Sequence, residues 1–206
     1  MLRIDILIAV IATIAGIYLL AKYKLKYLLT FFLISLIAES IGFYLSNEKR
    51  NNVLIFNLYS VFQFIYILNI YTKFHQEKIL KSLLITIPLI CLINIFFIQG
   101  PKTFHTYSFM LGALIIIAVS IFHLWSLFNL GKVDNILKNS SFWFAIGFLL
   151  YFTGSLSIIG VFNYIATLPK YFINLSRNLL VSVNTITYIL LLLSMIFFKS
   201  SGLHRN

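Results

Sequence analysis

The sequence predicts an all-α, polytopic integral membrane protein, folded as a bundle of seven transmembrane helices. The 206 residues are 61% hydrophobic and only 10% charged, with a mean hydropathy of +0.98, whereas a soluble domain is about half apolar and a quarter charged. The apolar residues form seven runs, each close to the roughly 20 residues that a helix needs to cross a bilayer. The separators are short and carry charged or turn-forming residues, so the chain 1–206 is predicted to be a single transmembrane domain.

The seven predicted helices follow one another with brief connections. The first apolar run is followed by Lys22, Lys24 and Lys26, whereas a cleaved secretory signal carries its positive charge in front, so the first helix is expected to be retained. Pro88 is expected to kink or to begin the fourth helix. The stretch "YFINLSRN" is either an extension of the last helix or an interfacial segment. The predicted spans are residues 4–21, 26–45, 53–71, 82–99, 107–129, 142–163 and 174–198.

The distribution of Lys and Arg predicts how the bundle is oriented. Ten of these residues fall in the connections on one side of the membrane and five on the other, because Arg177 lies within or beside the last helix and is left out. Cytoplasmic loops carry the excess of Lys and Arg. The count therefore predicts that the N-terminus is outside and the C-terminus inside.

The net charge of +11 does not indicate nucleic-acid binding, because the basic residues separate apolar runs and do not gather on a domain face. The expected partners are the lipid bilayer, a small-molecule or lipid ligand, and a cytoplasmic protein or anionic lipid at the basic inner face. The single cysteine, Cys91, allows no intrachain disulfide. No cofactor is expected, since nucleotide-binding and hydrolase motifs are missing, and no metal, since no two histidines share ligand spacing. The oligomeric state stays open.

Glu39 is the only acidic residue in the interior of a predicted span, because Asp5 lies at the edge of the first one. It lies six residues before residue 45, about 9 Å of helix rise below the outer end of the second span. A carboxylate inside a membrane costs several kcal/mol unless it faces the bundle. Ser35, Gly42 and Ser46 follow the same helix face as Glu39. Glu39 is either a ligand or proton site or a structural hydrogen-bond anchor.

Polar residues at a similar depth on three other predicted helices suggest an outward-facing pocket around Glu39. An ion pair between Glu39 and Arg177 would lower the cost of burying each, but Arg177 could instead reach the outer headgroups. Asn, Ser and Thr in membrane helices also serve simply to join helices. The predicted pocket residues are Glu39, Asn57, Tyr59, Gln63, Tyr151, Thr153, Arg177, Asn178 and Asn184.

His123 lies in the inner half of the fifth predicted span, in "SIFHLWSLF". Its side chain titrates near physiological pH, so it is a candidate proton-sensing residue. The alternative is a packing histidine whose hydrogen bonds are satisfied.

The segments "ESIGFY", "NNVLIFNLYSVFQFIYILNIY" and "SFWFAIGFLLYFTGSLSI" resemble a family of uncharacterised seven-helix inner-membrane proteins found in Bacteroidota. The resemblance spans most of the chain and implies a bacterial inner (cytoplasmic) membrane. It implies no activity. The family's recurring acidic position in the second helix and its Asn-Tyr pair in the third correspond to Glu39, Asn57 and Tyr59.

Three functions are compatible with these patterns. The first is a sensing or accessory protein that binds a small molecule or lipid in an outer polar pocket. The second is a small transporter, which would place its binding groups near the midplane between repeats or broken helices. The third is a membrane-embedded lipid-modifying enzyme, which needs Glu39 and Arg177 to converge. An enzyme is the least favoured of these three functions. A purely structural role is a further alternative.

Overall fold

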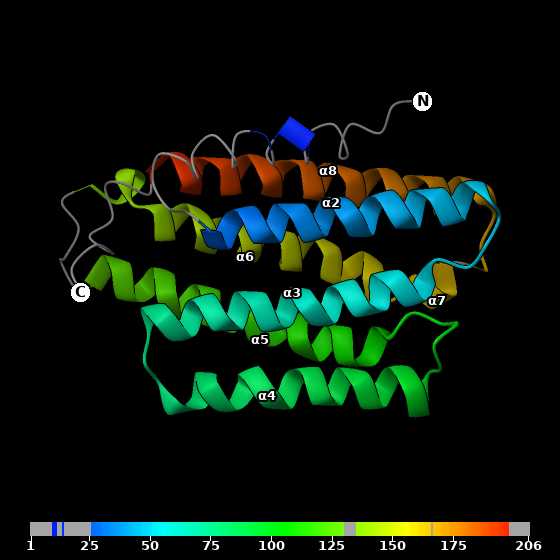
Figure 1. Ribbon diagram of the computed structural model, residues 1–206, viewed down its shortest axis with the longest axis horizontal. Helices are drawn as coiled ribbons and strands as arrows, with labels where there is room; N and C mark the ends of the chain where they lie inside the picture. Colours follow the sequence, from blue (N-terminus) through cyan, green and yellow to red (C-terminus); the bar gives the residue numbers. More distant parts are fainter. Residues whose placement is uncertain (1–9, 12–13, 15–25, 130–134, 166, 198–206) are drawn as a thin grey trace.

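The computed structural model describes residues 10, 11, 14, 26–129, 135–165 and 167–197 (Figure 1). Helices dominate this part of the chain, and six of them are long and apolar enough to cross a bilayer. The predicted helical membrane bundle is therefore supported. The predicted first span, 4–21, falls almost wholly outside the described residues, so a seventh span stays a prediction.

Each described long helix overlaps one predicted span. Short connections join them: a turn at Glu48–Arg50, two loops, and the short helix α7. The elements are α2 (Lys26–Asn47), α3 (Val53–Phe74), α4 (Lys78–Ile93), the π-helix η1 (Asn94–Ile98), α5 (Thr106–Asn129), the 3₁₀ helix η2 (Ile136–Lys138), α6 (Ser140–Ile159), α7 (Phe162–Ile165) and α8 (Lys170–Ile196).

Two helices start four residues before the predicted bounds. The fourth helix begins at Lys78, one turn before residue 82, so Pro88 lies inside α4 and does not begin it. The last helix begins at Lys170, directly after Pro169, and the stretch "YFINLSRN" is its first two turns. Proline is well suited to the position before a helix because its fixed φ and missing N–H cost nothing there. This resolves the alternative of a separate interfacial segment.

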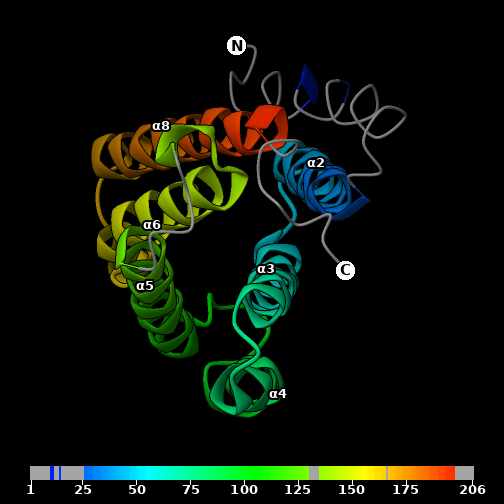
Figure 2. The same cartoon turned by 90° about the vertical axis from the view of Figure 1, so that its left-hand side faces the viewer.

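The described helices form two layers, seen end-on in Figure 2. One layer consists of α2, α3 and α4, with α3 packed against both neighbours, and the other of α8, α6 and α5, with α6 in the middle. The chain runs down one layer and returns up the other. As a result α2 and α8, far apart in sequence, meet at one edge of the bundle.

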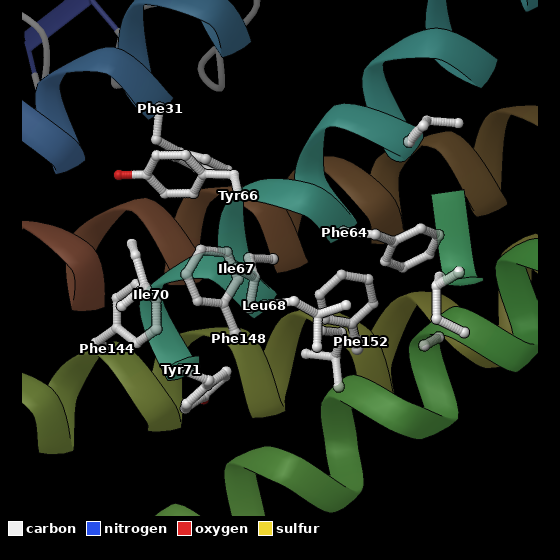
Figure 3. Close-up of a cluster of buried hydrophobic side chains, with 14 of the residues drawn as sticks. Phe31, Phe64, Tyr66, Ile67, Leu68, Ile70, Tyr71, Phe144, Phe148 and Phe152 are labelled. Atoms are coloured by element: carbon white, nitrogen blue, oxygen red, sulfur yellow. The ribbon is translucent and has the colours of Figure 1, made fainter. Parts of the chain in front are cut away.

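Large aromatic side chains fill the space between the layers (Figure 3). The ring centroids of Phe31 on α2 and Phe148 on α6 are 5.4 Å apart, and those of Phe64 on α3 and Phe152 on α6 are 5.7 Å apart. Phe32, Phe64, Phe148 and Phe152 are fully buried. Because such rings are long, they join the layers without bringing the helix backbones close together.

Candidate functional site

A buried polar cluster lies among these aromatic residues, where α2, α3, α6 and α8 meet. We call it the Glu39 cluster. At its centre the Tyr188 hydroxyl donates a 2.8 Å hydrogen bond to Oε1 of Glu39. Glu39 is 4% exposed, as expected for a carboxyl group that must avoid lipid. The members are Ser35 and Glu39 on α2, Tyr59 and Gln63 on α3, Tyr151 on α6, and Tyr188 on α8.

Counting protons assigns the donors within the cluster. The Ser35 hydroxyl donates to the carbonyl of Phe31 at 2.8 Å. Its single hydrogen is then used, so the 2.6 Å bond between Ser35 and Tyr59 must have the Tyr59 hydroxyl as its donor. The Tyr151 hydroxyl donates to Oε1 of Gln63 at 3.4 Å, and Gln63 also interacts with Tyr59. Of the three tyrosines only Tyr188 bonds to Glu39, whereas Tyr59 and Tyr151 interact with the carboxyl group electrostatically.

The cluster sits close to the middle of its helices. Gln63 lies ten residues after Val53 and eleven before Phe74, the ends of α3. Glu39 lies eight residues before Asn47, because α2 extends past residue 45, which places it about 12 Å of helix rise from that end. Glu39 therefore still lies in the half of α2 that ends at Asn47, which is the predicted outer half, whereas Gln63 lies at the middle of α3. Four members are buried and two, Tyr59 and Tyr151, are half-buried, so in this conformation the carboxyl group is enclosed and does not face an open pocket.

A second polar group lies at the end of the bundle that holds the α2–α3 and α4–α5 connections. We call it the His105 network; its members are Asn57, Ser60, Asn94, Gln99, His105 and Ser108. Asn57 donates from Nδ2 to the carbonyl of Thr103 at 2.9 Å and accepts from the backbone N–H of His105 at 3.2 Å. These two bonds fix the loop before α5 against α3.

The tautomer of His105 follows from its partners. Ser60 donates its hydroxyl to the carbonyl of Asn57 at 2.8 Å, so it accepts from Nε2–H of His105. Nδ1 of His105 then accepts from the Ser108 hydroxyl at 2.7 Å. The second bond requires a neutral ring, because Nδ1 can accept only while it carries no proton, whereas Nε2–H donates in either charge state. Burial lowers the pKa of His105 to about 4, because the charged form loses its hydration.

The structure divides the predicted pocket residues into separate groups. Four of them, Glu39, Tyr59, Gln63 and Tyr151, come together in the Glu39 cluster. Asn57 belongs to the His105 network. The remaining residues are not in either group: Thr153 is exposed and bonds to the carbonyl of Leu149 in its own helix, Arg177 and Asn178 are exposed, and Asn184 is half-buried.

The predicted pair of Glu39 with Arg177 does not form in this structure. Glu39 bonds to Tyr188, and Arg177 lies eleven residues earlier on α8, about 16 Å of helix rise away. That distance exceeds the reach of an arginine side chain. The exposed position of Arg177 agrees with the alternative that its guanidinium reaches toward the headgroups.

His123 belongs to neither group. It is buried on α5, and its Nδ1 lies 2.8 Å from Nε2 of His75, the residue that follows α3. The His123 ring stacks on Phe74 with centroids 4.7 Å apart. Burial lowers the pKa of His75, which favours a neutral ring. The ring of His75 is the polar partner of His123. The role of His123 as a proton sensor stays a prediction.

No metal centre is apparent within residues 26–129, 135–165 and 167–197, where no group of three or more His, Cys, Asp or Glu side chains could hold an ion. The chain also matches no protein-family model, no curated protein and no solved structure. The functional argument therefore depends on the geometry of this chain alone.

Two features were missed by the sequence reasoning. Tyr188 is not among the predicted pocket residues, although Leu191 and Met195 follow it at spacings that mark a buried helix face. Asn94 interrupts an otherwise apolar run, and polar residues inside membrane helices usually face a partner. That rule would have directed attention to the His105 network.

Proposed function

We propose that this chain is a multi-pass membrane protein with a sensing or accessory role, and that it binds a small molecule or a lipid. The Glu39 cluster is the part of the protein that responds to this ligand. The supporting observation is the bond between Tyr188 and Glu39, which joins the two layers across a buried interface. An ionisable group inside a membrane protein is by default a functional candidate. We further propose seven spans, an external N-terminus and a bacterial inner membrane, as the sequence predicts.

The chemistry of the cluster indicates what the ligand must offer. Glu39 is an acceptor, and in the closed conformation a tyrosine hydroxyl of the protein itself occupies it. Aromatic rings line the site, with the centroids of Phe32 and Tyr188 5.8 Å apart. A ligand with an ammonium group or a strong hydrogen-bond donor would compete with Tyr188 for Glu39 and gain contacts with the aromatic faces.

Binding would act by shifting a two-state equilibrium. The closed state has Tyr188 on Glu39, and the open state has the ligand there and the layers slightly apart at the α2–α8 edge. A ligand shifts such an equilibrium only by its difference in affinity for the two states. The contacts that would separate are the bond between Glu39 and Tyr188 and the packing of Phe32 on Tyr188.

A test is the thermal stability of the detergent-solubilised protein, screened against small amines and membrane lipids. The wild type, Glu39→Gln and Tyr71→Phe are compared. Tyr71→Phe is the matched control, since it removes a buried tyrosine hydroxyl that bonds to Ser120 outside the cluster. A ligand that stabilises the wild type and Tyr71→Phe but not Glu39→Gln supports the proposal. Equal stabilisation of all three contradicts it.

A small transporter is the second candidate function. The mid-helix position of Gln63 and Tyr151, between two layers of helices, favours it, because transporters bind substrates near the midplane. The π-helical end of α4 is a further local irregularity. Uptake of the stabilising ligand into proteoliposomes, abolished by Glu39→Gln, would support transport over sensing. The third candidate, a lipid-modifying enzyme, was expected to bring Glu39 and Arg177 together, and here they lie about 16 Å of helix rise apart.

A further inference from the structure

A cavity of about 250 Å³ lies between α4–η1 and α5, at the end of the bundle that carries the His105 network. Its wall is almost wholly apolar, and no charged side chain lines it. Two lining residues, Asn94 and Ser108, are buried and belong to the network, where Asn94 donates to Gln99 and Ser108 donates to His105. The other lining residues are Ile90, Ile93, Ile98, Tyr107 and Leu111.

The apolar lining extends along the helices and is open to the outside of the bundle. Ile90 and Ile98 are eight residues apart, which is about 12 Å of helix rise. Ile90, Tyr107 and Leu111 are 41%, 69% and 42% exposed. Both helices are long and apolar enough to cross a bilayer, so the lipid hydrocarbon meets the open side. An apolar wall in that position selects an acyl chain, because a polar group placed there would lose its hydrogen bonds to water without replacing them.

The loop at the end of the cavity is basic. Residues 99–105 join η1 to α5, and the exposed Lys102 is the only Lys, Arg, Asp or Glu among them. Asn51 donates from Nδ2 to the carbonyl of Lys102 at 3.2 Å. This bond brings the loop beside the turn at Glu48–Arg50, which adds two cations and one carboxylate. The excess of positive charge here complements an anionic headgroup at the membrane surface.

We propose that this cavity holds one acyl chain of an anionic bilayer phospholipid, whose phosphate lies at Lys102. The chain lies along Ile90, Ile93 and Leu111, and the headgroup stays outside the cavity at the basic loop. The volume is below the roughly 300 Å³ of the smallest typical ligand pockets, so it admits part of one chain and not the headgroup. The site is separate from the Glu39 cluster and does not rest on the function proposed for that cluster.

The headgroup is tested by titrating the detergent-solubilised protein with dioleoylphosphatidylglycerol and with dioleoylglycerol, which has the same chains but no phosphate, and recording the melting temperature. We expect the phospholipid to stabilise at about fivefold lower mole fraction, the factor that one lysine contributes near an anionic headgroup. Lys102→Gln should remove this difference. Lys170→Gln should keep it, because Lys170 is an exposed cation that begins α8 at the same end of the bundle (Figure 1). Equal potency of the two lipids on the wild type, or an equal loss in both variants, overturns the proposal.

A second pair of variants tests the position of the chain. Leu111→Trp places a large side chain in the cavity. Leu114→Trp is its matched control, because Leu114 is an exposed residue of the same helix that does not line the cavity. Loss of the dioleoylphosphatidylglycerol response in Leu111→Trp alone supports the site. Retention of the response in Leu111→Trp, or its loss in both variants, means that the lipid acts elsewhere and overturns the proposal.

Discussion

The hydroxyl of Tyr188 donates a 2.8 Å hydrogen bond to Oε1 of Glu39 and so joins α8 to α2. The two residues are 149 positions apart in the sequence. They belong to different layers of the bundle, and the bond lies among aromatic rings that exclude water. Breaking it would expose the carboxyl group to the space between the layers, which is why we regard this contact as the responsive part of the protein.

Removing the Tyr188 hydroxyl should weaken the ligand-free protein. Tyr188→Phe loses a buried bond to a carboxyl group, which contributes about 1.5–3 kcal/mol when the acceptor is charged, whereas Tyr71→Phe loses a hydroxyl–hydroxyl bond of about 1 kcal/mol. Thermal unfolding in detergent measures both. The assignment of Tyr188 as the principal donor to Glu39 fails if the two substitutions lower stability equally.

Gly112 and Gly147 should respond in opposite directions to substitution by alanine. A Cβ at Gly112 would lie 2.5 Å from Cζ of the fully buried Phe64, whereas at Gly147 it would meet Leu190 at an ordinary 3.4 Å. Gly112→Ala therefore should cost about 1–3 kcal/mol through overpacking. Gly147→Ala should be neutral or stabilising, since alanine favours a helix by up to about 1 kcal/mol over glycine. Melting temperatures of the two variants check the described packing of α5 on α3.

Acid should destabilise the protein through His105. Its pKa is lowered to about 4 in the folded state by burial, against about 6.5 when unfolded. Between these values the unfolded chain binds a proton that the folded chain refuses, so stability falls as the pH drops from about 6.5 to about 4. His105→Gln should flatten the melting temperature across this window.

His75→Gln provides the comparison for that experiment. The pKa of His75 is also lowered by burial, but Glu77 nearby favours its charged form. His75→Gln should therefore flatten the pH profile less than His105→Gln. The same slope in the wild type and in His105→Gln would show that the buried ring does not govern the acid response.

The predicted orientation can be tested with single cysteines. Arg50 lies in the exposed turn between α2 and α3, and Lys78 is the exposed first residue of α4, at the opposite end of α3. The native Cys91 is buried, which keeps background labelling low. A membrane-impermeant maleimide should label Arg50→Cys in intact cells and Lys78→Cys only after permeabilisation. The reverse pattern would refute the predicted orientation of the described helices.

The helices were predictable because bilayer thickness imposes one length on every span. The ends of the helices were less predictable. Charged and polar residues in "YFINLSRN" obscured the start of α8, which only Pro169 marks. The pairing of helices into two layers could not be predicted, because most of the surface of each helix is apolar and only a few polar positions distinguish its faces. Lipid and the bundle core are equally apolar solvents, so hydropathy does not tell one face from the other.

The helices that contribute to the site could be predicted, but not all of the residues that form it. Polar residues on α2, α3, α6 and α8 indicated a common cluster, and Glu39, Tyr59, Gln63 and Tyr151 do come together. Asn57 lies six residues from Gln63 on α3, about 9 Å of rise, so it joins a different network. The depth of a residue along its helix and the rotation of that helix about its axis decide which polar group the residue joins. A single sequence determines neither the depth nor the rotation closely enough to predict this. Ligand binding by the cluster stays a prediction.

The central claim is that a ligand displaces Tyr188 from Glu39, and the most direct measurement compares the affinity of a stabilising ligand for the wild type, Glu39→Gln and Tyr188→Phe. Isothermal titration in detergent gives the three dissociation constants. Glu39→Gln should abolish binding. Tyr188→Phe should bind the ligand more tightly than the wild type, although it is less stable alone, because the competing hydroxyl is gone. Weaker binding by Tyr188→Phe, or undiminished binding by Glu39→Gln, would contradict the account.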